Sequence, residues 1–232
     1  MIAVVIVAAG RGTRMGSDAD KLFLPVAGRP LVGHTWALFD GLEDVAEIIV
    51  VVRSGEEDRF RLLAVESGFQ KTWRCVTGGG ERQDSVWNGL RSVSSGIDWV
   101  AIQDGARPCT SPRAVRAILE AARRVGAAVA AQKVQDTLKE ADDERRAVRT
   151  VDRERLWSVQ TPQVFRVEVI RRAMEAVRAR GLRVTDDTAA CELIAQPVEL
   201  VETVDPNPKV TVPSDLEYVG WLLGRRRDGP GG

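Results

Sequence analysis

The chain has 232 residues, enough for one domain with a sizeable core, and its 44% hydrophobic content is typical of a globular protein. Its 33 basic residues balance 33 acidic residues in number, so the net charge indicates no nucleic-acid or membrane partner. The three cysteines, Cys75, Cys109 and Cys191, lie far apart. This spacing argues against a disulfide framework or a zinc site and favours a reducing cytoplasm.

Apolar runs of strand length alternate along the chain with segments of helical periodicity. The predicted strands are, in order, Ile2–Ala8, Glu47–Val52, Trp73–Val76, Trp99–Ile102, Ala127–Ala131 and Val198–Val201. The predicted helices are Pro30–Phe39, Asp58–Glu66, Asp84–Val93, Pro112–Val125, Val167–Arg180 and Asp187–Ile194, and a capping box from Ser214 to Glu217 opens a last helix. The alternation predicts a three-layer α/β fold with a mostly parallel sheet, whose ligands bind at the carboxyl ends of strands. We expect residues 1–232 to form one domain.

Residues 133–156 interrupt this alternation. Two charged, strand-like pieces flank an acidic turn at 141–144, with too few apolar residues for a core of their own. An isolated two-stranded ribbon is marginal in water, so we expect this β-arm to pack on another surface, preferably that of a second copy of the chain. The alternative is a solvated hairpin that lies on its own domain.

The first loop, AAGRGTRMGSDADK at 8–21, combines glycines with the cations Arg14 and Lys21. Glycines let backbone N–H groups approach an anion closely, and two cations are enough to surround a triphosphate. A P-loop is excluded because Gly16 is followed by Ser-Asp and not by lysine and a hydroxyl residue. The dinucleotide-binding pattern is also excluded, because the last glycine comes one residue too late and the next long strand ends at Arg53.

Further clusters of glycine, hydroxyl and charged residues follow the later strands. They are GGGERQDS at 78–85, DGARP at 104–108, VDR at 151–153, TPQ at 161–163, TDD at 185–187 and NPKVT at 207–211. Asp104 suits a ribose or magnesium, and Arg107 suits a phosphate or hydroxyl groups. Turn chemistry and surface charge are the better explanation of any one cluster, so the functional interpretation depends on all of them together.

In this order, AAGRGTRMG with Lys21, GGGERQDSV, DGARP, DTLK, VDR with LW and TPQ, TDD and NPKVT resemble the 2-C-methyl-D-erythritol 4-phosphate cytidylyltransferases. The resemblance runs from Ile2 to the helix at Ser214. It implies a Rossmann-like nucleotidyltransferase fold and transfer of CMP from CTP to a branched polyol phosphate of the non-mevalonate isoprenoid pathway. It also implies Mg²⁺ or another divalent cation, a cytoplasmic homodimer built through the β-arm, and no nucleic-acid or membrane partner. Because the chain ends without the cyclase domain fused to some relatives, we expect one activity.

The resemblance also implies roles for individual residues. The implied nucleotide-binding residues are Ala8, Ala9, Gly10, Gly12, Gly79, Ser85, Asp104 and Ala106. The implied acceptor-binding residues are Asp104, Arg107, Thr137, Arg153, Thr161, Thr185 and Lys209, of which Thr137 and Arg153 come from the partner's arm. Arg14 and Lys21 act on the triphosphate, with Lys21 at the α-phosphate, and Arg153 and Lys209 act on the acceptor phosphate. Asp104 completes the shell of a magnesium ion held mostly by the CTP phosphates. Gly80 and Arg11 depart from the aspartate and the aromatic residue common in the family.

Other functions stay open at this point. A cytidylyltransferase for another polyol phosphate, such as ribitol 5-phosphate, would share the first loop, the DGARP-like segment and TPQ. An inactive nucleotide-binding protein that serves as a dimer scaffold would not need to retain Arg14, Lys21, Asp104 and Lys209. A Rossmann oxidoreductase is the most distant alternative, and binding of NAD(H) would test it.

Overall fold

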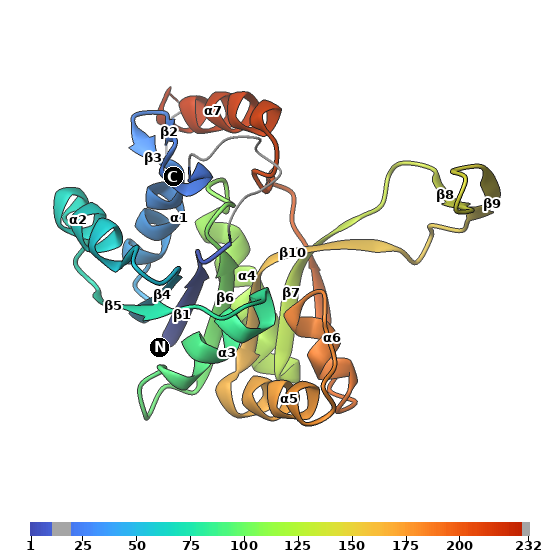
Figure 1. Ribbon diagram of the computed structural model, residues 1–232, viewed down its shortest axis with the longest axis horizontal. Helices are drawn as coiled ribbons and strands as arrows, with labels where there is room; N and C mark the ends of the chain where they lie inside the picture. The colour runs from blue at the N-terminus through green and yellow to red at the C-terminus, as the bar shows by residue number, and fades with distance from the viewer. Residues whose placement is uncertain (11–19, 229–232) are drawn as a thin grey trace.

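The computed structural model describes residues 1–10 and 20–228, with side chains described up to residue 225. Within these residues, a seven-stranded sheet lies between two layers of helices (Figure 1), in the strand order β11-β7-β10-β6-β1-β4-β5. The strands of the sheet are β1 (Ile2–Val7), β4 (Val45–Val52), β5 (Thr72–Thr77), β6 (Trp99–Asp104), β7 (Ala127–Lys133), β10 (Trp157–Arg166) and β11 (Glu199–Glu202). The helices are α1 (Leu31–Asp40), α2 (Glu57–Ser67), α3 (Arg82–Arg91), α4 (Pro112–Val125), α5 (Val167–Ala179), α6 (Asp187–Glu192) and α7 (Pro213–Asp228). A 3₁₀ turn, η2 (Lys21–Phe23), and a hairpin of β2 (Pro25–Val26) and β3 (Arg29–Pro30) precede α1.

The side chains of β1 show how the two apolar layers form. Ile2, Val4 and Ile6 belong to the cluster that includes side chains of α1, α2, α4 and α7. Ala3 and Val5, which point to the opposite face, belong to the cluster with α3, α5 and α6. Because helices cover both faces, the strands are mostly apolar and most of the polar chemistry is left to the strand ends. The buried Glu47 of β4, which pairs with Arg74 of β5, is an exception.

The strand connections place a crevice at one edge of the sheet. The chain runs from β1 to β4 and β5 on one side and then crosses to β6, which pairs with the other side of β1. These pairings are all parallel, so the ends of the strands meet at the same edge. Where the strand order reverses, between β1 and β6, the connections leave in opposite directions and open a crevice for a ligand.

Strand β10 is the main element without a counterpart in the sequence prediction. It runs antiparallel to both β6 and β7, although the sheet is otherwise parallel. The sequence does not read as a strand because Pro162 lies in its middle, and proline is unusual inside a central strand. At this point the Thr161–Pro162 peptide is cis and the register of the pairing with β7 shifts. The predicted strands and helices do correspond to elements, and Pro112–Val125 matches α4 in full.

The capping box predicted at Ser214 is wrong. Helix α7 begins at Pro213, and the Asp215 carboxylate accepts hydrogen bonds from the N–H groups of Thr211 and Val212. Proline suits the first position of a helix, so the helix begins before Ser214. Asp215 then occupies the third helical position, from which it reaches back to the free N–H groups.

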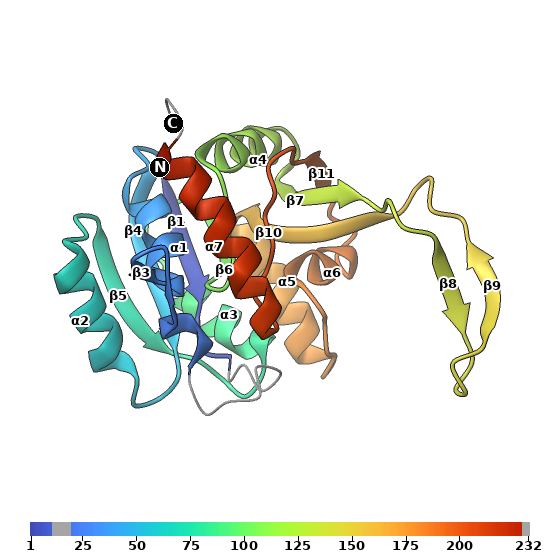
Figure 2. The same ribbon diagram turned by 90° about the horizontal axis from the view of Figure 1, so that it is seen from above.

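Residues 133–156 form the predicted arm. Within it, β8 (Leu138–Ala141) pairs antiparallel with β9 (Ala147–Val151), and most side chains of both strands are exposed. Extensions of β7 and β10 carry the arm away from the body (Figure 2). In the described part of the chain, no helix has the length and apolar composition needed to cross a lipid bilayer.

Candidate active site

A cleft of about 620 Å³ opens at the crevice predicted by the strand order. Its lining combines glycine-rich loops with charged side chains from distant parts of the chain. The lining residues are Val7, Ala8, Ala9, Gly10, Lys21, Leu22, Arg53, Ser54, Thr77, Gly78, Gly79, Gly80, Glu81, Arg82, Ser85, Asp104, Gly105, Ala106, Lys209 and Thr211. The ends of β1, β4, β5 and β6 therefore contribute to one cleft.

The first two glycines of the loop after β5, Gly78 and Gly79, pack too tightly for side chains. A Cβ atom at Gly78 would lie 2.5 Å from the Ala9 Cβ atom and 2.8 Å from the Ser85 Oγ atom. The Gly79 N–H group donates a hydrogen bond to Ser85 Oγ at 3.2 Å, which ties the loop to the first turns of α3. Glycine is needed here because the backbone itself forms the wall of the cleft.

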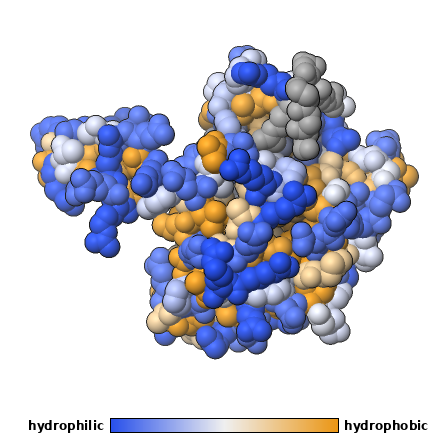
Figure 3. Space-filling view, turned by 180° about the vertical axis from the view of Figure 1, so that it is seen from behind, coloured by the Kyte–Doolittle hydropathy of each residue, from blue (hydrophilic) through white to orange (hydrophobic). Residues whose placement is uncertain are grey.

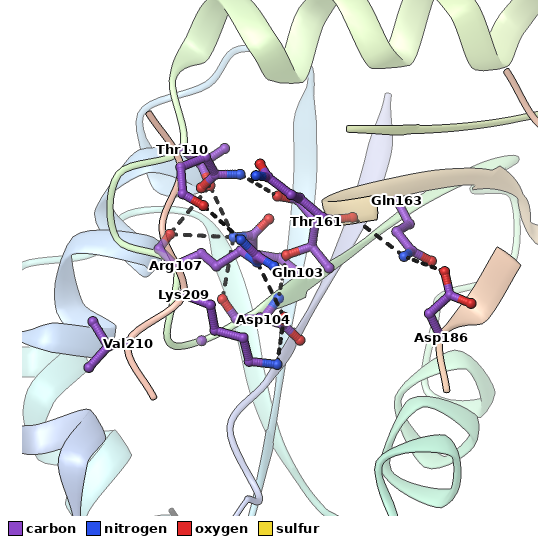
Figure 4. A network of polar contacts seen from close by, with 12 residues as sticks. Gln103, Asp104, Arg107, Thr110, Thr161, Gln163, Asp186, Lys209 and Val210 are labelled. Carbon is purple, nitrogen blue, oxygen red and sulfur yellow. Dashed lines mark hydrogen bonds and ion pairs between the residues drawn. The ribbon is translucent and has the colours of Figure 1, made fainter. Parts of the chain in front are cut away.

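Asp104, at the end of β6, is the charged centre of the cleft. In Figure 4 the side chains of Arg107 and Lys209 converge on it. Its Oδ2 atom lies 2.9 Å from Lys209 Nζ and 3.4 Å from Arg107 Nε, and its Oδ1 atom lies 3.4 Å from Arg82 Nε. Burial raises the pKa of Asp104, but the charges of Lys209, Arg82 and Arg107 outweigh burial and hold the pKa at about 2. The carboxylate is therefore ionised throughout the neutral range.

We expect Asp104 to stabilise the fold at neutral pH by about 2 kcal/mol, because its pKa falls from 3.8 to about 2 on folding. A lowered folded pKa means that this contribution is complete above the unfolded value and is lost as pH falls through the folded value. Urea unfolding of wild type and Asp104→Asn at pH 7 and pH 3 will measure it. The stability difference between the two proteins should narrow at pH 3, and an unchanged difference would contradict the assignment.

Arg82 is a site residue that the sequence reasoning missed. Its guanidinium donates two hydrogen bonds to the buried carboxylate of Asp187, at 3.0 and 2.9 Å, besides its contact with Asp104. Burial raises the pKa of Asp187, and the charge of Arg82 opposes that rise. Arg82 therefore joins the start of α3 to the end of β6 and the start of α6. These partners lie 22 and 105 residues away, and the one available signal was its place in GGGERQDS.

Asn207 is a second missed residue, and it positions the loop that carries Lys209. Its backbone carbonyl accepts a hydrogen bond from Arg107 Nη1 at 2.7 Å, and its side chain bridges the Thr110 hydroxyl and the Thr161 carbonyl. The side chain is buried, so these bonds replace water in a dry environment. The loop is thereby tied to both the DGARP segment and β10.

Two lysines reach the cleft from opposite ends of the chain. Lys21 begins η2, and its ammonium group donates a hydrogen bond to the Val210 carbonyl at 2.8 Å. Val210 in turn donates its N–H to the Ala106 carbonyl, so Lys209 and Lys21 are held against the same loop. Both ammonium groups are fixed by protein acceptors in a cleft whose lining also includes glycine-rich backbone, an arrangement that suits a polyanion.

The structure brings together most of the predicted nucleotide-binding residues. The described ones that line the cleft are Ala8, Ala9, Gly10, Gly79, Ser85, Asp104 and Ala106, together with Lys21 and Lys209. Gly12, Arg14 and the departure at Arg11 lie outside the described residues. The other departure, Gly80, lines the cleft, and a Cβ atom there would meet only Asp84 Oδ2, at 3.9 Å.

The predicted acceptor-binding residues are more dispersed. Thr161 is buried, and its hydroxyl oxygen accepts a hydrogen bond from the Asp104 N–H at 3.0 Å. Thr185 is exposed in an adjoining depression that shares Glu81 and Arg82 with the cleft. Thr137 and Arg153 are exposed on the arm and do not line the cleft of their own chain. Contacts of these four residues with a substrate stay predictions.

The surroundings of Asp104 do not fit a metal ligand. Arg82 lies at one of its carboxylate oxygens, and Arg107 and Lys209 lie at the other. Hard divalent cations need free oxygen ligands, and the arginine and lysine side chains already occupy both carboxylate oxygens of Asp104. Across residues 1–10 and 20–225, no group of three histidine, cysteine or acidic side chains is placed to hold a metal ion.

Comparisons with known proteins agree with this architecture. Residues 2–225 match the model of the family described as 2-C-methyl-D-erythritol 4-phosphate cytidylyltransferase. The protein of that name from Pelotomaculum thermopropionicum is 43% identical over 227 residues, which cover 97% of this chain and 95% of that protein. The solved 4-diphosphocytidyl-2C-methyl-D-erythritol synthase of Anaerococcus prevotii has a TM-score of 0.84 at 28% identity, over 97% of this chain and 98% of its own. The solved 2-C-methyl-D-erythritol 4-phosphate cytidylyltransferase of Thermus thermophilus has a TM-score of 0.78 at 34% identity, and the match covers 95% of this chain and 98% of that chain. These structures confirm the predicted fold class.

Proposed function

The chain belongs to the 2-C-methyl-D-erythritol 4-phosphate cytidylyltransferase family, and from this premise we propose how its cleft performs the transfer. The enzyme converts CTP and 2-C-methyl-D-erythritol 4-phosphate to CDP-methylerythritol and pyrophosphate. The acceptor phosphate attacks the α-phosphorus of CTP in line with the departing pyrophosphate. The observation that carries the proposal is the meeting of Lys21, Lys209 and Asp104 in one cleft at the reversal of strand order.

The chemistry needs positive charge more than it needs a base. A phosphate monoester has a second pKa of about 6, so the acceptor is largely ionised at pH 7 without help from the protein. The main obstacle is repulsion between two anions, and charge builds up on the α-phosphate and the pyrophosphate as the reaction proceeds. Fixed cations that hold both anions in line therefore supply most of the catalysis, and no covalent enzyme intermediate is formed.

Each catalytic cation has an assigned partner. Lys21 stabilises the α-phosphate in the transition state, Arg14 binds the phosphate tail, and Lys209 binds the acceptor phosphate with Arg153 of the partner subunit. The Lys209–Asp104 ion pair of 2.9 Å and the Lys21–Val210 hydrogen bond of 2.8 Å support these roles. Both hold a flexible lysine in place before a ligand arrives, which reduces the reorganisation needed during the reaction.

We also propose that a divalent cation, Mg²⁺ or another, is carried mainly by the phosphate oxygens of CTP. It would supply charge neutralisation on the triphosphate. The pairing of Asp104 with protein cations argues against a direct role for this residue in metal binding.

We propose that residues 1–232 form one nucleotidyltransferase domain in the cytoplasm, and that the arm at 133–156 joins two copies. The arm stands clear of the body, and Figure 3 shows apolar surface on the body beside the point where the arm leaves it. Near that point Val204 is 80% exposed and Val159 is 36% exposed. Apolar surface of this kind favours an interface with another protein surface. A partner's arm would add Thr137 and Arg153 to the cleft.

Release of pyrophosphate with each of the four NTPs and two acceptors tests the proposed activity. We expect the highest kcat/KM with CTP and 2-C-methyl-D-erythritol 4-phosphate. Faster turnover with ribitol 5-phosphate would favour the alternative acceptor. Binding of CTP without release of pyrophosphate from it in the presence of either acceptor would favour the inactive scaffold.

A further inference from the structure

Asp20, the residue before Lys21, connects Lys21 to the sheet. Its carboxylate forms an ion pair of 2.5 Å with Arg53 Nη2 and accepts the Leu22 N–H at 3.1 Å. Arg53 directly follows β4 and lies 33 residues further along the chain. The Asp20 side chain is only 7% exposed, so the carboxylate is largely withdrawn from water. One carboxylate thus caps the turn that carries Lys21 and ties it to the end of a buried strand.

The remaining contacts of this turn hold its far side. Leu22 is buried in the apolar cluster of α1 and α2, and the rings of Phe23 and Phe60 form a T-shaped pair with their centroids 4.9 Å apart. These contacts fix the turn against the body, but they lie on the residues after Lys21. The peptide that enters Lys21 is held by Asp20, through its side chain and through its carbonyl, which accepts the Phe23 N–H at 2.9 Å.

We propose that Asp20 and Arg53 are positioning residues that set the direction of Lys21 toward the nucleotide. This inference rests on the role assigned to Lys21 in the proposed function. Asp20 fixes the backbone on the N-terminal side of Lys21, and the Val210 carbonyl holds its ammonium group at the other end. Lys21 is therefore held at its backbone and at its ammonium group. The Asp20–Arg53 pair fixes the backbone position, and rotation of the lysine side chain cannot compensate for a shift of that backbone.

The location of the pair argues for positioning over fold stability. Arg53 lines the cleft and is 29% exposed, so Asp20→Asn leaves a partly solvated guanidinium and should change the stability of the folded chain little. Arg53→Met leaves the largely buried Asp20 carboxylate without its partner and should lower stability more. A small displacement of a group at the reacting centre, in contrast, has a large effect on rate. The two roles therefore predict different results for melting temperature and for kcat.

The test compares Asp20→Asn and Arg53→Met with wild type. Each variant removes one charge and keeps a similar shape, and Asp20→Asn retains an oxygen that can accept the Leu22 N–H. We expect kcat to fall about 10-fold in each variant because Lys21 loses its alignment. The melting temperature of Asp20→Asn should stay within about 3 °C of wild type, and kcat of every variant is measured at a temperature at which that variant is fully folded. Arg53→Lys, which keeps the charge, should recover part of the loss.

Arg124→Met is the matched control. It makes the same chemical change in an ion pair of similar length, Arg124 to Glu199 at 2.6 Å, on an exposed surface away from the cleft. Its kcat should stay within about 2-fold of wild type. The double variant Asp20→Asn/Arg53→Met should be no slower than the slower single variant, because both changes break the same contact.

Combining each variant with Lys21→Ala shows whether Asp20 and Arg53 act through Lys21 or act on the nucleotide directly. Because the pair acts through Lys21, adding Asp20→Asn or Arg53→Met to Lys21→Ala should cause no further loss in single-turnover rate. A further loss equal to that in wild type, or a raised KM for CTP that persists in this background, would show independent action and overturn the inference. If Lys21→Ala is inactive while both single variants keep the wild-type kcat, the inference alone fails. If Lys21→Ala keeps most of its kcat, the assigned role of Lys21 fails first, and the inference falls with it.

Discussion

Replacing Lys21 with alanine is expected to lower kcat about 100-fold or more, because one preorganised charge is removed from the developing pentacoordinate α-phosphate. The ammonium group lines the cleft and is held by the Val210 carbonyl at 2.8 Å, so the charge is already in place before the reaction begins. The loss should appear in kcat and kcat/KM together, as expected for a contact made mainly in the transition state. Steady-state pyrophosphate release with CTP and 2-C-methyl-D-erythritol 4-phosphate measures both.

Two further variants make the result specific. Lys71→Ala removes a lysine that precedes β5, at the end of the sheet opposite the cleft, and should leave kcat unchanged. Lys21→Arg keeps the charge but replaces a compact ammonium with a planar guanidinium, so we expect it to restore activity only in part. Most of the wild-type kcat in Lys21→Ala would remove this residue from the mechanism.

Arg153→Ala should also nearly abolish turnover, and mixing it with Lys21→Ala should restore activity if the arm is exchanged between subunits. In a hybrid dimer, one site combines Lys21 from one chain with Arg153 from the other, while the second site lacks both. Hybrids purified through two different tags should therefore show about half of the wild-type kcat per dimer. This recovery follows because Arg153 is exposed on the arm and does not line the cleft of its own chain.

The double variant Lys21→Ala/Arg153→Ala, expressed alone, is the control, because every site in its dimers lacks both groups. It should stay inactive under the same conditions. If the arm instead folds back on its own body, both sites of a hybrid are defective and no recovery is seen. An inactive hybrid of confirmed dimeric mass would therefore overturn the proposed sharing of the site.

The fold was predictable because it depends on local patterns. Apolar runs such as Ile2–Ala8 and helical periods such as Pro112–Val125 depend on neighbouring residues, and both correspond to elements of the structure. β10 escaped prediction because its position between β6 and β7 is defined by pairing with residues far away in the sequence. Pro162 also breaks the local strand pattern that would have revealed it.

The candidate site also has a part that the sequence predicted and a part that it did not. The position of Asp104 at the end of an apolar strand indicated a ligand site, because parallel strands bring their carboxyl ends to one edge of the sheet. Its partners could not be read from the sequence. The pairing of Arg82 with Asp104 and Asp187 requires the end of β6, the start of α3 and the start of α6 to meet in space.

The sequence by itself determined the layered sheet, the edge that carries the cleft, the family, and the candidate residues Lys21, Lys209 and Asp104 that line the cleft. These features could be predicted because they depend on residues close together in the sequence: apolar runs form buried strands, and glycines let the backbone approach an anion closely. Only the tertiary structure decided that Asp104 is neutralised by protein cations, that Asn207 anchors the Lys209 loop, and that Asp20 meets Arg53. Charge pairing acts between side chains brought within a few ångströms of each other, and chain folding sets those distances independently of separation in the sequence.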